Sequence, residues 1–139
     1  MGLIYLLDTN ILSEPVRKVP NAKITAHIQK NAGSIAIAAT TWHEMLFGLF
    51  RMPISYKRTI IEHYLLHSVQ IEIPILAYDA AAAEWFAAER ARLTQIGRPP
   101  PYPDGQIAAI AATNNLILIT RNMADFADFA GLTVENWFD

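Results

Sequence analysis

Residues 3–10 read Leu3-Ile4-Tyr5-Leu6-Leu7-Asp8-Thr9-Asn10, an unbroken apolar run that ends in an acid and two small polar residues. The same design recurs as Leu116-Ile117-Leu118-Ile119 followed by Thr120-Arg121-Asn122. Short apolar runs without polar alternation are typical of parallel strands buried on both faces. The two segments therefore predict buried strands of a parallel sheet.

The rest of the chain alternates between strand and helix patterns. Further strand patterns lie at Ser34–Ile37, Val69–Ile73 and Thr133–Glu135. Helical patterns lie at about Ala22–Gln29, Thr41–Arg51, Tyr56–His67, Asp79–Ile96, Asp104–Thr113 and around Asp125. This alternation predicts an α/β fold with right-handed crossovers. The Pro-dense stretch Arg98–Pro103 is too short for a linker, so we expect residues 1–139 to form one domain.

Composition excludes several classes of protein. With 53% hydrophobic and 17% charged residues, the chain has the apolar content to fold, and part of its apolar surface is expected to lie in a partner interface. The absence of cysteine excludes thiolate nucleophiles and Cys-based metal sites. A net charge of −2 argues against a broadly basic nucleic-acid binder. No apolar stretch is long enough to cross a bilayer, and no signal-peptide pattern precedes Asp8, so we expect no membrane contact and a cytoplasmic location.

Four acids are expected at one edge of the sheet. Asp8 ends the first strand, and Glu44 lies in the first turn of the helix after the second. Asp104 begins the helix that runs back before the strand ending at Thr120, and Asp125 follows that strand. Ligand sites of such sheets lie beyond the carboxyl ends of the strands. Clustered carboxylates repel one another unless a cation neutralises them, and hard oxygen ligands select Mg²⁺ or Mn²⁺. The cluster therefore predicts metal-dependent hydrolysis of a phosphodiester.

Each acid also has a purely structural explanation. Asp8 and Asp104 are suited to cap helices, and Thr41-Trp42-His43-Glu44 has the type and spacing of a capping box. Asp125 is suited to complement a helix dipole. The convergence of all four on one edge favours the functional interpretation.

Four ordered blocks carry a resemblance to a known family. They are Leu6-Leu7-Asp8-Thr9-Asn10-Ile11-Leu12-Ser13-Glu14, Thr41-x-x-Glu44-x-x-x-Gly48, Asp104-x-x-Ile107-Ala108-Ala109 and Thr120-Arg121-Asn122-x-x-Asp125-Phe126. Together they resemble the PIN-domain family, and within it the VapC toxins of bacterial toxin–antitoxin pairs. The resemblance implies a PIN-like three-layer α/β fold, with a central parallel sheet of about five strands flanked by helices.

The resemblance also implies a function. It implies a Mg²⁺- or Mn²⁺-dependent endoribonuclease toxin that forms a homodimer and is neutralised by a VapB-type antitoxin. RNA is the implied substrate, with tRNA as the first candidate, and DNA contact would come only through the antitoxin. By position, Asp8, Glu44 and Asp104 match the metal-binding acids. Family members place a fourth acid where this chain has either Asn122 or Asp125, and we assign Asp125.

Polar neighbours of the acids have candidate roles. Thr9, Asn10, Thr120 and Asn122 are suited to hydrogen-bond the carboxylates or a bound water, although ordinary turn and cap chemistry explains them as well. Arg98 and Arg121 are candidate phosphate contacts, although surface arginines are often merely solvated. The alternative function is a catalytically silent binding module that acts through its dimer and partner contacts. Metal binding that stabilises the folded protein would distinguish the two.

Overall fold

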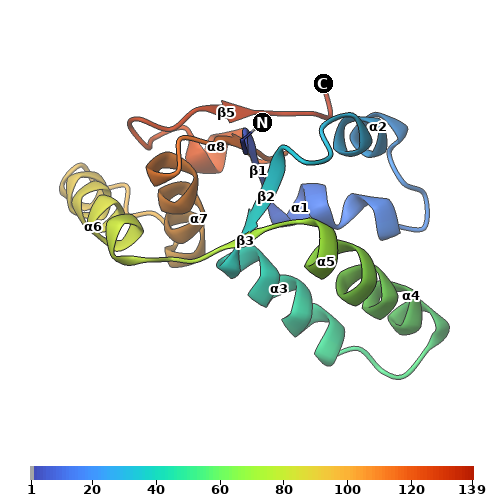
Figure 1. The fold of residues 1–139 in the computed structure, drawn as a ribbon. Helices are drawn as coiled ribbons and strands as arrows, with labels where there is room; N and C mark the ends of the chain where they lie inside the picture. Colours follow the sequence, from blue (N-terminus) through green and yellow to red (C-terminus); the bar gives the residue numbers. More distant parts are fainter. Residues whose placement is uncertain (1) are drawn as a thin grey trace.

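The sheet holds five parallel strands in the order β3-β2-β1-β4-β5. The computed structural model describes residues 2–139 and is drawn in Figure 1. The strands are β1 (Tyr5–Leu7), β2 (Ile35–Ala38), β3 (Ile75–Leu76), β4 (Ile117–Ile119) and β5 (Val134–Glu135). Both segments predicted as buried parallel strands are confirmed, as β1 and β4, and they lie next to each other in the sheet. The predicted α/β fold with a parallel sheet of about five strands is confirmed.

The strand order reverses at β1, in the centre of the sheet. From β1 the chain adds β2 and then β3 on one side, and it returns past β1 to add β4 and β5 on the other. Leu6 lies opposite Ala36 of β2 and Leu118 of β4. The carboxyl ends of β1 and β4 therefore meet at the switch point, where sheets of this kind bind ligands.

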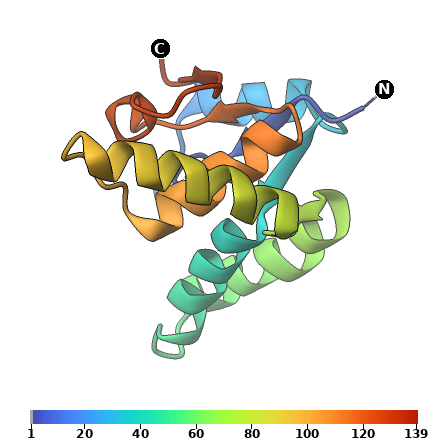
Figure 2. The ribbon, with the colours of Figure 1, turned by 90° about the vertical axis from the view of Figure 1, so that its left-hand side faces the viewer.

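Helices cover both faces of the sheet, as Figures 1 and 2 show. Their bounds are α1 (Thr9–Leu12), the 3₁₀ turn η1 (Glu14–Val16), α2 (Ala22–Lys30), α3 (Ala39–Phe50), α4 (Tyr56–Tyr64), the π-helical turn η2 (Leu65–Val69), α5 (Gln70–Glu72), α6 (Ala80–Gln95), α7 (Tyr102–Thr113) and α8 (Met123–Phe126). Alternate strand residues point to opposite faces. Leu6 and Leu118 pack in the core under α6, α7 and α8. Leu7 and Ile119 pack in the core under α1, α2, α3 and α4. Two cores on one sheet confirm the three-layer arrangement.

Helices α6 and α7 form the layer that positions Asp104. Helix α6 ends at Gln95, and the chain turns at Gly97, whose φ of 75° suits glycine, before the proline-rich loop leads directly into α7. The two helices approach closely where Gly105 faces the buried ring of Phe86. The loop predicted at Arg98–Pro103 is confirmed as far as Pro101, and its last two residues belong instead to the first turn of α7.

The strand predicted at Val69–Ile73 is wrong. The helical path of α4 continues through η2 and α5 to Glu72, and the strand begins only after Pro74. Val69 and Ile73, four residues apart, turn inward, whereas Ile71 is 73% exposed. Residues i and i+4 share one face of a helix, so this burial pattern is helical. The alternation of apolar and polar residues in the segment had instead suggested a strand. Because Pro74 has no N–H, it ends the helix and leaves a short edge strand.

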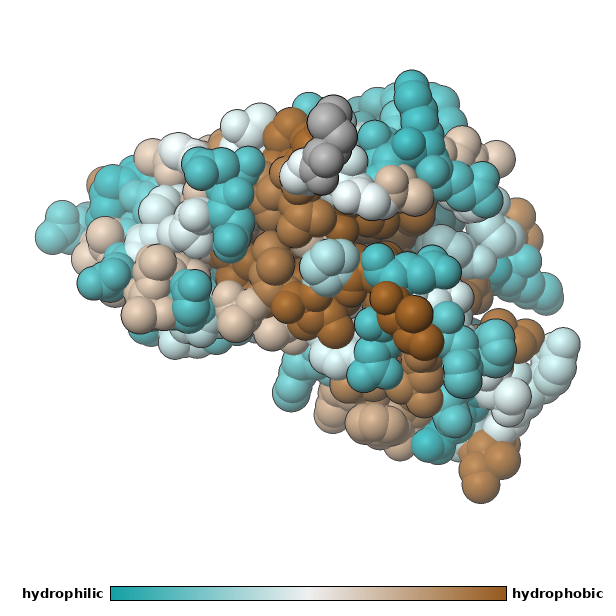
Figure 3. All heavy atoms as spheres, viewed as in Figure 1, coloured by the Kyte–Doolittle hydropathy of each residue, from teal (hydrophilic) through white to brown (hydrophobic). Residues whose placement is uncertain are grey.

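Apolar side chains remain at the surface despite the two cores. Figure 3 shows an apolar band across the face that carries the edge strand β3, and an apolar tip between α3 and α4. At this tip Phe50, Ile54 and Tyr56 are 67%, 96% and 82% exposed. Exposed apolar patches of this kind mark interaction surfaces. None of the helices described here has the length and apolar character to cross a membrane.

Candidate active site

Asp8 lies at the switch point, fixed by hydrogen bonds to both of its carboxylate oxygens. The backbone N–H of Thr9 donates to Asp8 Oδ1 at 2.8 Å, and the Thr120 hydroxyl donates to Oδ2 at 2.8 Å. The backbone N–H of Asp8 donates to the carbonyl of Ile119 at 2.8 Å, which joins β1 to β4 at this point. Asp8 is only 8% exposed. The site therefore presents a rigid, nearly buried carboxylate at its centre.

Glu44 reaches the same point from α3. This helix follows β2 without a loop, so its first turns stand at the carboxyl edge of the sheet. The Thr9 hydroxyl donates to Glu44 Oε2 at 3.1 Å. Thr9 thus holds two acids with two different groups, its N–H on Asp8 and its hydroxyl on Glu44. One turn earlier on α3, the Thr40 hydroxyl donates to Gln106 Oε1 of α7 at 3.0 Å.

Asp104 and Asp125 complete the cluster from α7 and α8. Asp104 is the third residue of α7 and is partly buried, and Asp125 is exposed in the first turn of α8. Burial is the main cause that raises the pKa of Asp104 to about 6, and the negative charges of Asp125, Asp8 and Glu44 raise it further. The structure therefore brings the four predicted acids within electrostatic range of one another.

The pKa values of Asp8 and Glu44 are also raised. For Asp8 the main cause is burial, joined by the charge of Asp125 and opposed by the hydrogen bonds from Thr120 and Thr9. For Glu44 burial again dominates, with the charge of Asp8 acting in the same direction. The hydrogen bond from Thr9 and the charge of His43 oppose these effects on Glu44. The raised pKa values thus reflect burial first and the negative charge of neighbouring acids second.

Two of the capping interpretations are wrong and one is confirmed. Helix α3 begins at Ala39, so Thr41 lies inside its first turn and caps nothing. The Thr41 hydroxyl is buried without a hydrogen-bond partner. Helix α7 begins at Tyr102, so Asp104 is not its N-cap. Asp8, by contrast, does cap α1 through Thr9. For Glu44 and Asp104 the helix-cap explanation is thereby removed.

The other polar candidates make hydrogen bonds in the segments next to Asp8. Asn10 Oδ1 accepts from the backbone N–H of Arg121 at 3.2 Å, which links α1 to the segment after β4. The backbone N–H of Asn122 donates to the Thr120 hydroxyl at 3.1 Å, and the side chain of Asn122 makes no capping bond to α8. Thr9 and Thr120 thus contact the acids directly, and Asn10 and Asn122 hold the chain around them.

The two predicted arginines lie in different settings. The guanidinium of Arg121 stands over the ring of Phe138 at 4.5 Å, beside the Asn10 contact. Arg98 is ion-paired with Asp128 at 3.2 Å, and both side chains are largely exposed. The backbone of Arg121 therefore lies beside Asn10 while its guanidinium packs on Phe138, and Arg98 is engaged with Asp128.

The donor set suits a hard divalent cation. Its members are carboxylates from four separate elements, each with oxygen lone pairs left beyond the hydrogen bonds described above. Among residues 2–139, no three Asp, Glu or His side chains stand close enough to ligate one ion in the conformation seen. The chemistry of the donors and the uncompensated charge on Asp104 fit a cation at this place.

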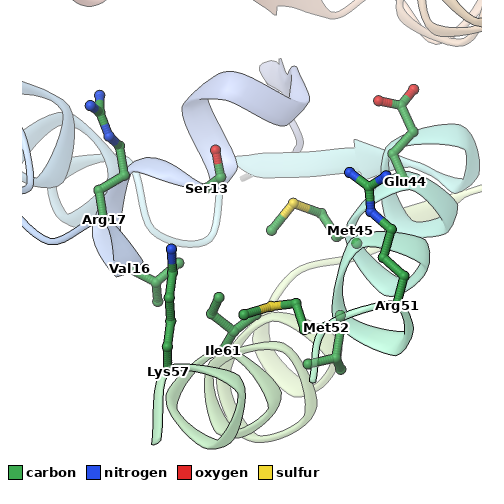
Figure 4. A pocket seen from close by; sticks show the side chains of 11 residues that line it. Ser13, Val16, Arg17, Glu44, Met45, Arg51, Met52, Lys57 and Ile61 are labelled. Carbon is green, nitrogen blue, oxygen red and sulfur yellow. The ribbon is translucent and has the colours of Figure 1, made fainter. Parts of the chain in front are cut away.

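Three cations near Glu44 were not anticipated from the sequence. Arg17, Arg51 and Lys57 line a groove of about 400 Å³ whose wall also includes Glu44. Figure 4 shows them around an apolar floor, with Arg17 beside η1, Arg51 at the end of α3 and Lys57 on α4. One signal was available, because Glu44, Gly48 and Arg51 follow the i, i+4, i+7 spacing of one helix face. Arg17 and Lys57 come from distant segments and carry no such signal.

The comparisons with known proteins agree with this geometry. The PIN domain matches residues 5–132, and the chain belongs to the PIN-domain family. It is 32% identical over 136 residues to the tRNA(fMet)-specific endonuclease VapC of Shigella flexneri, covering 97% of this chain and 98% of that relative.

Solved structures show the same likeness. FitAcB from Neisseria gonorrhoeae is 28% identical with a TM-score of 0.88, covering 97% of this chain and 99% of the other. DNA-bound VapBC from Salmonella typhimurium is 25% identical with a TM-score of 0.85, covering 97% and 98%. The resemblance to the PIN-domain family is thereby confirmed, including its VapC branch.

Asp104→Asn should stabilise the metal-free protein at neutral pH. The pKa near 6 lies above the ordinary 3.8, so the folded state holds a proton that the unfolded chain releases. This stabilisation is complete below about pH 4 and is lost as the pH rises through about 6. The full shift corresponds to about 3 kcal/mol, which solvent screening of a half-buried group reduces to about 1 kcal/mol. Asparagine does not ionise, so the advantage of the variant should grow between pH 4 and 6.

Urea unfolding in chelator across pH 4 to 8 measures this difference. Glu84→Gln, which neutralises an exposed acid of α6, is the control and should show no such trend. Lower stability of Asp104→Asn than of wild type at pH 7.5 would contradict the close approach of the four acids.

Proposed function

We propose that this protein is a metal-dependent endoribonuclease toxin that hydrolyses RNA phosphodiester bonds at the cluster of Asp8, Glu44, Asp104 and Asp125. The observation that carries the proposal is the convergence of these acids, from four separate elements, at the switch point of the sheet. Relatives named as ribonucleases support it.

The acids are the proposed ligands of Mg²⁺ or Mn²⁺. When bound, such a cation neutralises the cluster, binds phosphate oxygens, activates water and stabilises the leaving oxygen. Thr9 and Thr120 orient Glu44 and Asp8 through their hydroxyl groups, which limits how far these two carboxylates must move to bind the cation. Arg121 is the proposed contact to a substrate phosphate, because it lies beside Asn10 at the edge of the cluster. We propose the same role for Arg98 once its ion pair with Asp128 opens.

The proposed partners are a VapB-type antitoxin, RNA and a second copy of the chain. The exposed apolar tip between α3 and α4 and the band over β3 supply the surface that such contacts need. Solved relatives are toxin–antitoxin complexes, some bound to DNA, which supports indirect DNA contact through the antitoxin. A relative named for tRNA(fMet) makes tRNA the first substrate to test, and the cytoplasm the proposed place of action.

Cleavage of total RNA by the purified, partner-free protein tests the proposal. We expect fragments in Mg²⁺ or Mn²⁺, none in chelator, and none once the cognate antitoxin is added back. A folded protein that binds the metal and cleaves no RNA, tRNA included, would instead support the silent binding module.

The fourth acid can be identified with two parallel variants. Asp125→Ala should lower the cleavage rate by about a hundredfold, because it removes one negative charge that acts on both Asp8 and Asp104. Asn122→Ala should cost less than about tenfold, since the contact of Asn122 with Thr120 is made by its backbone. The reverse order of the two rates would move the fourth position to Asn122.

A further inference from the structure

An exposed tyrosine stands beside the acid cluster at the start of α7. Tyr102 is the first residue of α7 and Asp104 the third, so the two are only about 3 Å apart along the helix axis. Tyr102 is 51% exposed. Its ring meets that of Phe86 of α6 edge-on, with the two centroids 5.3 Å apart. The first turn of α7 therefore carries a proposed metal ligand and a half-exposed aromatic ring.

An arginine of α6 lies over this ring. The guanidinium of Arg90 is 5.5 Å from the centroid of the Tyr102 ring. Arg90 is exposed, and none of the ion pairs within residues 2–139 involves it. A cation–π contact leaves the N–H donors at the rim of the guanidinium free to bind an anion. Tyr102 and Arg90 thus combine a flat aromatic surface with an available positive charge.

A second tyrosine joins this pair from the end of β3. Tyr78 follows β3 by two residues and packs, partly buried, against the core under α6 and α7. Burial is the main cause that raises its pKa, Tyr102 raises it further, and the charge of Arg90 lowers it. The three side chains are therefore close neighbours where α6 lies across α7 in Figure 2. We call Tyr78, Arg90 and Tyr102 the tyrosine–arginine platform.

The strand order fixes where this platform lies relative to the acids. Along the carboxyl edge of the sheet, the order is Tyr78 after β3, Glu44 on the helix after β2, Asp8 after β1 and Arg121 after β4. The platform is thus on the β3 side of the acids, and Arg121, the proposed phosphate contact, is on the β4 side. A nucleic-acid strand continues in both directions from the phosphate that is cleaved. A strand bound by Arg121 and the acids therefore extends toward the platform.

An unpaired nucleotide suits this platform better than a peptide does. Aromatic rings and arginine guanidinium groups stack on the bases of single-stranded RNA, and arginine also binds phosphate. Apolar side chains of a protein partner gain more at the tip between α3 and α4, where several large apolar residues are exposed together. The platform offers a single half-exposed ring instead, placed in line with the acids. Only a strand cleaved at those acids has to pass along this line.

We propose that the tyrosine–arginine platform stacks on a base of single-stranded RNA close to the cleaved phosphate, on the β3 side of the acids. Tyr102 supplies the ring, Arg90 the charge for the neighbouring phosphate, and Tyr78 supports Tyr102 from below. This inference rests on the proposed ribonuclease function and adds the path of the substrate strand along the sheet edge. It also assigns the nucleotide preference beside the cut to residues that contact no acid.

Tyr102→Leu tests the stacking contact. Leucine keeps an apolar side chain against Phe86, so α6 and α7 stay packed, but it offers no ring to a base. Single-stranded RNA octamers with 2-aminopurine at each position in turn are bound in chelator, which prevents cleavage. We expect one position to be quenched by wild type and by Tyr102→Phe, and to stay unquenched with Tyr102→Leu. The RNA affinity should fall about fivefold or more in Tyr102→Leu and stay within about twofold in Tyr102→Phe.

Arg90→Gln tests the charge of the platform. RNA affinity is measured by fluorescence anisotropy over about 50 to 200 mM salt. We expect about three- to fivefold weaker binding, and a slope of log affinity against log salt that is smaller in magnitude by about 0.7, as for one lost phosphate contact. Two controls lie on α4 and α2, away from the platform. Tyr56→Ala removes a tyrosine that is 82% exposed, Lys30→Gln removes an exposed lysine, and both should bind within about twofold of wild type.

Two results would overturn the inference. The first is equal RNA affinity of wild type, Tyr102→Leu and Arg90→Gln, with the same quenching in all three. The second is unchanged RNA binding by Tyr102→Leu together with loss of antitoxin binding or of the dimer, which would assign the platform to a protein contact.

Cleavage assays on the same proteins separate the two levels of the proposal. A wild type that cleaves RNA, with a Tyr102→Leu variant that binds and cleaves it equally well, removes this inference alone. A wild type that neither binds nor cleaves RNA removes the proposed function itself.

Discussion

Asp8→Asn should lower the rate of RNA cleavage by at least about a thousandfold and leave the fold intact. Asp8 is the most buried of the four acids and the one fixed on both oxygens. Loss of its charge weakens the hold on a divalent cation, which supplies several kcal/mol to the transition state, and each 1.4 kcal/mol is about tenfold in rate. Asparagine still accepts from the Thr9 N–H, and its amide can donate to the Thr120 oxygen.

The matched control is Asp79→Asn. Asp79 is also an N-cap, since its carboxylate accepts from the N–H of Ala82 at the start of α6, and asparagine caps equally well. Single-turnover cleavage and far-UV circular dichroism on both variants separate chemistry from folding. An Asp8→Asn variant that cleaves at the wild-type rate would show that Asp8 is not part of the catalytic centre.

Gly105→Ala should destabilise the protein by about 3 kcal/mol. A Cβ at this position would collide with the ring of Phe86, which is only 2% exposed and has little room to move. The collision separates α6 from α7 next to Asp104, so activity should fall along with stability. Thermal unfolding should show a drop in Tm of about 10 °C.

Two further variants show whether the collision is the cause. Gly48→Ala places a Cβ in open space on α3 and should be neutral or slightly stabilising, because alanine favours helix. The double variant Gly105→Ala with Phe86→Leu should be more stable than the sum of the single effects predicts, by about 1 kcal/mol or more. Strict additivity would contradict direct contact between the two positions.

The segments that could be predicted best are those whose local pattern and tertiary role agree. The apolar runs before Asp8 and Thr120 lie in the middle of the sheet, and their continuous hydrophobicity reflects burial on both faces. Because the ends of parallel strands share an edge, the meeting of Asp8 with Asp104 and Asp125 followed from topology alone. The assignment of residues 1–139 to one PIN-like domain stays a prediction, which a single cooperative unfolding transition would support.

Other features depend on contacts that no local pattern encodes. The segment Val69–Ile73 alternates in sequence, yet a helix continuing from α4 determines its conformation. The bonds from Thr9 to Glu44 and from Thr120 to Asp8 join residues 35 and 112 positions apart. The rim of the groove likewise combines Arg17, Arg51 and Lys57 from separate elements, so its charge becomes visible only in the folded chain.

The most direct test of the account is the rate at which wild-type protein cleaves one labelled RNA as Mn²⁺ or Mg²⁺ is titrated from zero. The account predicts no cleavage in chelator, a rate that rises and saturates with metal, and recovery when metal is returned to chelated protein. Asp8→Asn should stay at the background rate throughout the titration. Cleavage that continues unchanged in chelator, or that is equal in Asp8→Asn, would contradict a metal-dependent centre built on the four acids.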